Sequence, residues 1–487
     1  MSGFLFLLLV TPLICTFLSC VLHKSKHAMS IIIFVVSSFS FLASILLIKG
    51  FLDIGEHLVA MNFLGFISMQ LEPISLIFIC MVTFLWSCTN LYSISYLKVN
   101  HEIIPTKFYF FLSISIFVTI CIALAPNLVV TFIFYELLTI FTYPLVAHIG
   151  GDKECKSARI YLYMLMGASM LLFLPALGFL LAHIGHSDFV IGGIAKNLPV
   201  GSVTILFLFF LYGVAKSAIV PMHFWLPEAM VASFPVSAVL HAVAVVKSGI
   251  FIMLKISVYI FGLDYLRSNI FSFLDTNIVS VLCGLSLLIS SVFAIYQTRI
   301  KLLLAYSTIS QLSICLLAMS MFHPLAITAA ILHMVSHAFG KITLFFASGY
   351  VYSSSKISDI KDFAGLGNKM KLIMAMFTMA SLSIIGLPIF AGFISKAYIY
   401  YSAISQDINY FVLAVLSISI LITADYFIKV IYIIYEEPKV ISKKAEVNYS
   451  YKLHSSMTCA IILTFLGLTS YMFLYDHIVD LMSLVAY

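Results

Sequence analysis

Fourteen apolar stretches, each long enough to cross a bilayer as a helix, divide this chain of 487 residues. Spanning takes about 20 residues, because a helix rises about 1.5 Å per residue through a hydrocarbon core about 30 Å thick. Hydrophobic residues make up 62% of the chain and charged residues 9%, which is too little charge to cover a water-soluble domain. We therefore predict an all-α polytopic membrane protein with about 14 transmembrane helices. The stretches lie near residues 3–22, 28–48, 73–96, 108–125, 127–148, 158–183, 202–220, 235–258, 277–297, 302–321, 325–352, 371–400, 409–435 and 455–475.

Basic residues are distributed unevenly over the connecting loops. Seventeen of the 26 lysines and arginines fall in loops that follow odd-numbered helices. Cytoplasmic loops carry such an excess, so we place these loops in the cytoplasm and both termini on the non-cytoplasmic side. The opposite side receives only Lys49, Lys196, Lys255 and Arg267. The net charge of +6 then reflects membrane topology and does not indicate a nucleic-acid partner.

The chain lacks the motifs that bind redox groups or nucleotides. Its nine cysteines are scattered without a CxxC pair, although iron–sulfur ligation needs clustered thiolates. No G-x-G-x-x-G follows a strand, and no P-loop is present. We expect no cofactor and no metal site, so energy must come from an ion gradient or from partner subunits.

One segment, from Gly213 to Glu228, places a lysine beside a broken helix inside an apolar stretch. Lys216 precedes Pro221 by five residues. A lysine at the bilayer centre costs at least about 2.5 kcal/mol, and interrupted helix is tolerated there only where it packs in protein or lines a wet cavity. Glu136 lies in the middle of another apolar stretch. We interpret both as parts of an ion or proton path; the alternatives are a structural Glu–Lys pair and a lysine that snorkels to the interface.

Two later helices carry further titratable side chains. Lys247 lies near the middle of the eighth stretch, and His241, six residues earlier, lies about 120° around the helix from it. The two would line a cavity from two sides, unless His241 is a neutral core histidine. His333, His337 and Lys341 are spaced by four, which stacks them on one helix face. This stripe predicts a proton wire or the wall of a water channel.

A second lysine accompanies a second broken span. Pro388 interrupts the twelfth stretch, and Lys396 follows it. Each half of the chain therefore has a proline-broken helix with a nearby lysine, which predicts internal repeats with a site at each break. Asp425 and Lys429, four residues apart, are expected to neutralise each other locally.

These residues resemble those of the antiporter-like subunit family. That family comprises proton-pumping membrane subunits of respiratory complex I, related hydrogenases and Mrp-type cation/proton antiporters. The matching stretches run in family order over about residues 105–435. They are Phe134–Glu136, Lys216–Pro227, Pro235–Lys247, Leu303–Gln311, His337–Lys341 and Gly386–Lys396.

The resemblance implies a role for each matching position. Glu136 and Lys216 would form a modulating ion pair. Lys247 and Lys341 would be the central relay, and Lys396 the terminal proton-transfer residue. Gln311 departs from the family, because many relatives have a histidine there. Glutamine cannot titrate, although it can still orient water.

The resemblance also implies two inverted five-helix repeats, with broken helices 7 and 12. We expect N-terminal helices 1–3 over residues 1–104, a first repeat over 105–260, a second over 261–440 and a last helix over 441–487. The expected function is proton translocation in a multi-subunit Mrp-type Na+/proton antiporter of the bacterial inner membrane. Chain length favours the D-type Mrp subunit, although Leu240-His241-Ala242 with Val246-Lys247 resembles the longer branch. The alternatives are a proton-pumping subunit of complex I or a related hydrogenase, and an unrelated solute carrier with a substrate-sized pocket.

Overall fold

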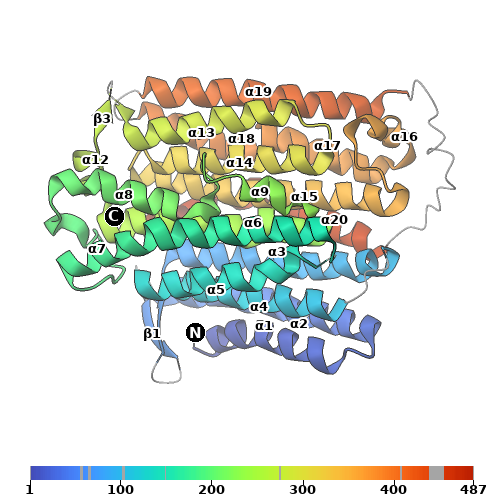
Figure 1. Cartoon of the computed structure of the whole chain (residues 1–487), viewed down its shortest axis with the longest axis horizontal. Helices are drawn as coiled ribbons and strands as arrows, with labels where there is room; N and C mark the ends of the chain where they lie inside the picture. The colour runs from blue at the N-terminus through green and yellow to red at the C-terminus, as the bar shows by residue number, and fades with distance from the viewer. Residues whose placement is uncertain are drawn as a thin grey trace.

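The apolar stretches form long helices that run side by side, as Figure 1 shows in this computed structural model. Twelve helical spans in the described part of the chain are long and apolar enough to cross a membrane. Two shorter apolar helices belong to the interrupted spans, Gly201–Gly213 and Lys371–Ile385. The prediction of an all-α polytopic membrane protein is confirmed, and the chain is an integral membrane protein. The structure describes residues 2–54, 59–63, 67–100, 105–148, 150–273, 276–405, 409–437 and 455–485.

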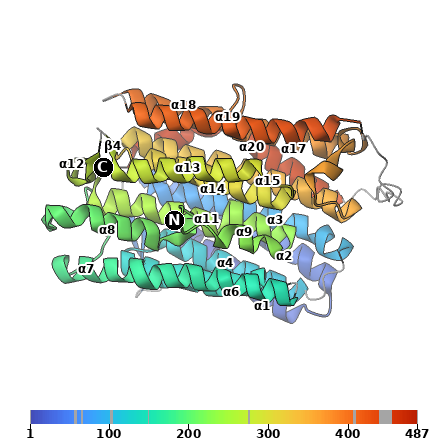
Figure 2. The ribbon, with the colours of Figure 1, turned by 45° about the horizontal axis from the view of Figure 1, so that its top comes forward.

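Ten spans are continuous α-helices. They are α1 (Ser2–Val21), α2 (Lys26–Ile54), α3 (Pro73–Val99), α4 (Pro105–Leu124), α5 (Leu128–Val146), α13 (Ile278–Ile295), α14 (Ile300–Met319), α15 (Pro324–Ser355), α19 (Tyr410–Tyr435) and α20 (Ser455–Ser483). In Figures 1 and 2, α19 lies along one edge of the bundle, and α1 lies at the opposite edge.

Two spans contain π-helical turns. One joins α6 (Asp152–Ala168), η1 (Ser169–Phe173) and α7 (Leu174–Ile184). The other joins α10 (Phe234–Ala238), η5 (Val239–Val243), α11 (Val245–Lys255) and η6 (Ile256–Phe261). The 18-residue apolar stretch within this span is entirely buried. This second span, with α14 and α15, forms the centre of the bundle. Single π-helical turns are found frequently at functional sites.

Two spans are interrupted, as the sequence predicts. The first runs through α8 (Val200–Gly213), η3 (Ala215–Ser217), α9 (Trp225–Glu228) and η4 (Ala229–Val231), with Pro221 in the gap before α9. The second runs through α17 (Lys371–Ile385) and α18 (Ala391–Ile404), with Pro388 in the gap between them. The predicted helix breaks are therefore confirmed.

Short elements close the ends of the bundle. Asn127, Asn277 and Asn409 cap α5, α13 and α19 by accepting a hydrogen bond from a first-turn backbone N–H. In Figure 1, α12 and β3 lie at the opposite end of the bundle from α16. The short elements are the antiparallel pairs β1 (Val59–Phe63) with β2 (Ile67–Leu71) and β3 (Ser272–Phe273) with β4 (Thr276–Asn277), and η2 (Ala195–Asn197), α12 (Leu263–Asn269), η7 (Ile360–Phe363) and α16 (Leu366–Lys369).

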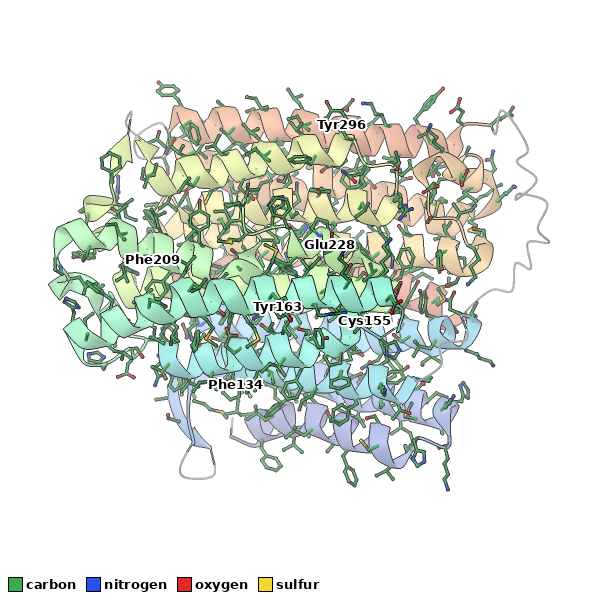
Figure 3. The ribbon with its side chains drawn as sticks, in the orientation of Figure 1. Phe134, Cys155, Tyr163, Phe209, Glu228 and Tyr296 are labelled. Atoms are coloured by element: carbon green, nitrogen blue, oxygen red, sulfur yellow. The ribbon has the colours of Figure 1, made fainter. Side chains whose placement is uncertain are left out.

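Many large hydrophobic side chains are exposed on the outer surface of the bundle, as a lipid-facing surface requires. Tyr163, Phe209 and Tyr296 are exposed on three different spans (Figure 3). The predicted domain boundaries after residues 104 and 440 lie outside the described residues. So do four lysines of the predicted loop after the thirteenth helix, which are Lys439, Lys443, Lys444 and Lys452.

Candidate functional site: a buried line of lysines and histidines

Lys216 reaches the helical turn of Glu136 without forming an ion pair. Its ammonium donates hydrogen bonds to the carbonyl oxygen of Tyr135 at 2.7 Å and to Oγ1 of Thr139 at 2.6 Å. It also lies 3.2 Å from the centroid of the Tyr135 ring, which is a cation–π contact. Both carboxylate oxygens of Glu136 are buried and have no hydrogen-bond partner among the described residues. The structure therefore brings Lys216 and Glu136 to the same turn of α5, but as separated groups.

Backbone N–H and C=O groups near Lys216 form hydrogen bonds with side chains from other segments. The indole N–H of Trp225 donates to the carbonyl oxygen of Ala215 at 3.0 Å, across the gap between η3 and α9. The amide of Val220 donates to Oγ of Ser286 on α13 at 3.0 Å. Such partners allow an interrupted helix to exist at membrane depth, because a free backbone group there is costly.

Lys247 contacts the histidine stripe directly. Its ammonium lies 2.6 Å from Nδ1 of His337, and both side chains are buried. Two residues further along α11, Gly249 lies directly against the backbone of Lys216 and Ser217, where a Cβ would clash. Lys216 and Lys247 therefore stand on two backbone segments that touch each other.

The predicted stripe on α15 is fully buried. The rings of His333 and His337 lie nearly parallel, with centroids 6.2 Å apart. Nδ1 of His333 lies 3.0 Å from Oγ of Ser395 on α18. Lys341, one turn beyond His337, donates to the carbonyl oxygen of Leu304 on α14 at 3.1 Å. The stripe therefore connects α11 and α14 with α18.

His241 and Gln311 are buried without hydrogen-bond partners among the described residues. His241 lies in the π-helical segment η5, and its ring packs against Phe345 of α15 at 5.2 Å between centroids. It therefore faces the same central helix that Lys247 faces. A buried polar group without a protein partner is usually satisfied by ordered water, so these two residues mark candidate water positions.

Lys396, on α18, bridges the gap of the second broken span by hydrogen bonds to the end of α17. Its Nζ atom donates to the carbonyl oxygens of Ile384 at 2.9 Å and Ile385 at 2.8 Å, the last residues of α17. Gly386 follows with a φ of +88°, a left-handed conformation that favours glycine. The lysine thus satisfies carbonyl groups that the break leaves without helical partners.

The pair Asp425 and Lys429 behaves as predicted. The two side chains form an ion pair of 2.6 Å within α19, and both are substantially exposed. Their position on the outer part of the bundle separates them from the buried line.

One buried ion pair was missed by the sequence analysis. The assignment of Lys255 to a loop is wrong, because Lys255 is the last residue of α11 and is fully buried. Its ammonium lies 2.5 Å from Oε1 of Glu72, also fully buried, and donates to the carbonyl oxygen of Ala125 at 3.2 Å. Lys255 lies inside the apolar stretch 235–258 that we predict to span the membrane, which is the signal that could have revealed it.

A cavity of about 610 Å³ opens near α9. It is lined by both acidic and basic side chains, among them Glu228, Arg299 and Lys301. Glu228 accepts a hydrogen bond from Ser157 of α6 at 2.9 Å. In Figure 3, Glu228 and Cys155 lie toward the same end of the bundle. This cavity brings polar surface close to the first broken span.

Comparison with known proteins places this chain in one class, the antiporter-like membrane subunits. Residues 125–423 match the family described as "NADH:quinone oxidoreductase/Mrp antiporter, TM". This match covers more than half of the chain. The chain belongs to this family.

Curated relatives include the putative antiporter subunit mnhA2 of Staphylococcus aureus strains JH9 and Mu3 / ATCC 700698. Each is 29% identical over 360 residues, which cover 68% of this chain and 42% of the relative. The match therefore spans less than half the length of these relatives. The relatives are described only as putative antiporter subunits, so the D type expected from the sequence stays a prediction.

Two solved structures share the fold over nearly the whole chain. A chain of the membrane-bound sulfane sulfur reductase, an archaeal respiratory membrane complex, has a TM-score of 0.83 at 20% identity, with 100% of this chain and 98% of that chain covered. A chain of the Mrp complex from Dietzia sp. DQ12-45-1b has a TM-score of 0.81 at 18% identity, with 98% of this chain and 96% of that chain covered. At these identities the similarity concerns the fold.

Proposed function

We propose that this chain is a proton-translocating subunit of a multi-subunit Mrp-type Na+/proton antiporter. The observation that carries the proposal is the buried contact of 2.6 Å between Nζ of Lys247 and Nδ1 of His337. Titratable side chains inside a membrane protein are expensive and usually mark ion or proton pathways. Here two of them touch, in the middle of a line that also contains Lys216, Lys341 and Lys396.

The relay works by exchanging charge partners. Pairing with Lys216 and binding a proton are two competing ways to neutralise the buried carboxylate of Glu136. When the ammonium of Lys216 moves from Tyr135 and Thr139 to Glu136, its field at Lys247 changes, because their two segments touch. Lys247 then releases or binds a proton through His337. On α15, His337 has Lys341 one turn to one side and His333 one turn to the other, and His333 faces α18, which carries Lys396.

Water supplies the links between these side chains. The cavity near Glu228 is the proposed inlet on the cytoplasmic side. His241, Gln311 and His333 each have a buried polar atom without a protein partner among the described residues, and these atoms are suited to hold the intervening waters.

The repeats and the topology belong to the same proposal. Residues 105–260 and 261–440 would be inverted repeats, which is supported by one broken span and one buried lysine in each. Both termini would lie on the non-cytoplasmic side of a bacterial inner membrane. The partners would be further membrane subunits of the same complex, of which this chain would be the D-type member.

Exchange in inverted membrane vesicles tests this function. The full chain is produced with its native partner subunits, and an imposed pH gradient is followed with a fluorescent dye after NaCl is added. We expect Na+ to dissipate the gradient, and Lys247→Met to abolish this response. A wild-type complex that leaves the gradient unchanged with every monovalent cation would contradict the antiporter function.

The second candidate is a proton-pumping subunit of complex I or a related hydrogenase, which is supported by the shared family description. Affinity purification from the native membrane separates the two. Co-purifying iron–sulfur or NADH-binding subunits would favour the redox complex, whereas partners that are all membrane subunits would favour the antiporter.

A further inference from the structure

Ser395 on α18 connects the histidine stripe with the second broken span. Its hydroxyl is fully buried and lies 3.0 Å from Nδ1 of His333 and 3.4 Å from Oγ of Ser336, both on α15. It also donates to the carbonyl oxygen of Gly392 at 3.0 Å. The next residue in the chain is Lys396. Ser395 therefore stands between the last histidine of the stripe and the last lysine of the line.

Lys396 itself does not provide this connection. Its Nζ atom donates to the carbonyl oxygens of Ile384 and Ile385, so it is directed to the end of α17. The hydroxyl of Ser395 is the polar group of α18 that meets His333. A proton that reaches His333 therefore finds a hydroxyl as its nearest partner on α18.

The hydrogen bonds around the two histidines are satisfied when the rings hold opposite tautomers. A charged ammonium has no acceptor, so Lys247 must donate to Nδ1 of His337, and the proton of that neutral ring is on Nε2. Ser395 donates its only proton to Gly392, so its oxygen accepts from His333, whose ring proton is on Nδ1. Both Nε2 atoms are buried and have no protein partner among the described residues. One Nε2 is thus a donor and the other an acceptor.

We propose that Ser395 is a positioning and proton-carrying residue that holds His333 in the Nδ1–H tautomer and links it to Lys396. This inference rests on the proposed relay. In that state a proton passes from Nε2–H of His337, through a bridging water, to the free Nε2 of His333. His333 then releases its Nδ1 proton to the oxygen of Ser395.

The proton count is conserved at each step. His337 loses one proton at Nε2 and regains one at Nδ1 from the ammonium of Lys247. His333 gains one at Nε2 and loses one at Nδ1. The hydroxyl of Ser395 takes that proton and gives up its own to the neutral amine of Lys396, directly or through a water. The net result is one proton moved from Lys247 to Lys396.

Serine variants in the intact complex test this inference. Ser395→Ala removes the hydroxyl, Ser395→Cys keeps the volume with a much weaker hydrogen-bonding group, and Ser395→Thr keeps the hydroxyl. Ser402→Ala is the matched control, because Ser402 is a buried serine on the same helix whose hydroxyl has no partner among the described residues. Each variant is assayed in vesicles for exchange rate, for the solvent isotope effect on that rate, and for melting temperature of the purified complex.

We expect Ser395→Ala and Ser395→Cys to lose at least fivefold in rate and to show a larger solvent isotope effect, with unchanged melting temperature. Ser395→Thr should stay within twofold of the wild type, as should Ser402→Ala. A smaller loss in both Ser395→Ala and Ser395→Cys overturns the inference, and so does a Ser395→Thr variant as slow as Ser395→Ala. Normal exchange in Lys247→Met would instead contradict the proposed function itself. The failure of the Ser395 inference and the failure of the proposed function are therefore distinguishable.

Discussion

Lys216 binds the turn of α5 that carries Glu136, yet the two charges are separated. The ammonium is held by the carbonyl oxygen of Tyr135 and the hydroxyl of Thr139, while the carboxylate has no hydrogen-bond partner in the described part of the chain. A buried ion pair that served stability alone would be closed, because each uncompensated charge costs several kcal/mol. Here the ion pair is separated, and the lysine has alternative hydrogen-bond acceptors in Tyr135 and Thr139. Such an arrangement suits a switch between two states.

We expect Lys216→Ala and Glu136→Ala each to abolish coupled exchange while the protein stays in the membrane at normal amounts. Either change removes one half of the switch, so the proton affinity of Lys247 can no longer be altered from this side. The measurement is cation-dependent dissipation of a pH gradient in vesicles, with quantitative blotting of the membranes. Wild-type exchange in either variant would refute the switch.

Gly386→Ala should destabilise the second broken span. Alanine at a φ of +88° is strained, and its Cβ would lie 2.7 Å from Cδ of Lys396, a side chain fixed by two hydrogen bonds. Strain of this kind costs about 1–3 kcal/mol. Thermal unfolding of the purified complex measures the effect, with Gly201→Ala as the control, because a Cβ there meets nothing within 4 Å. Equal melting temperatures for the two variants would show that the break tolerates a side chain.

The pair of Glu72 and Lys255 is expected to stabilise one end of the bundle by joining the N-cap residue of α3 to the last residue of α11. Lys255→Met alone should destabilise the protein by about 3–5 kcal/mol, because it leaves a buried carboxylate unpaired. The double variant Glu72→Leu with Lys255→Met should recover most of that loss, since an apolar pair of similar size is often neutral in such positions. Unfolding of the purified complex compares the variants. A stable double variant without exchange would instead place this pair in the relay.

Much of the fold follows from the sequence. The length of the apolar stretches predicts the membrane-spanning helices, and Pro221 and Pro388 mark the two broken helices. The spacing of His333, His337 and Lys341 by four gives a shared helix face. These features depend only on local periodicity and backbone chemistry, which a single sequence contains.

Contacts between distant segments are harder to predict. The partner of Lys247 is His337, 90 residues away, and nothing in local spacing specifies this pairing. Lys255 was misplaced because its partner Glu72, the residue before α3, is far away in the sequence, and a lysine near the end of an apolar run resembles an interfacial anchor. Ser395 carries no charge, so no sequence signal distinguishes it from other helical serines. Such relationships depend on how helices pack, which the three-dimensional structure supplies.

The contact between Lys247 and His337 lies at the centre of the proposed relay, and the exchange rate of Lys247→Met in vesicles is its most direct test. The matched control is Lys429→Met, which removes an exposed lysine whose ion pair lies on the outer part of the bundle. Exposed pairs contribute about 0–1 kcal/mol, so this control should keep both stability and exchange. We predict that Lys247→Met loses cation-coupled proton exchange by at least tenfold while Lys429→Met exchanges normally. Normal exchange in Lys247→Met, at wild-type amounts of folded complex, would contradict the proposed relay.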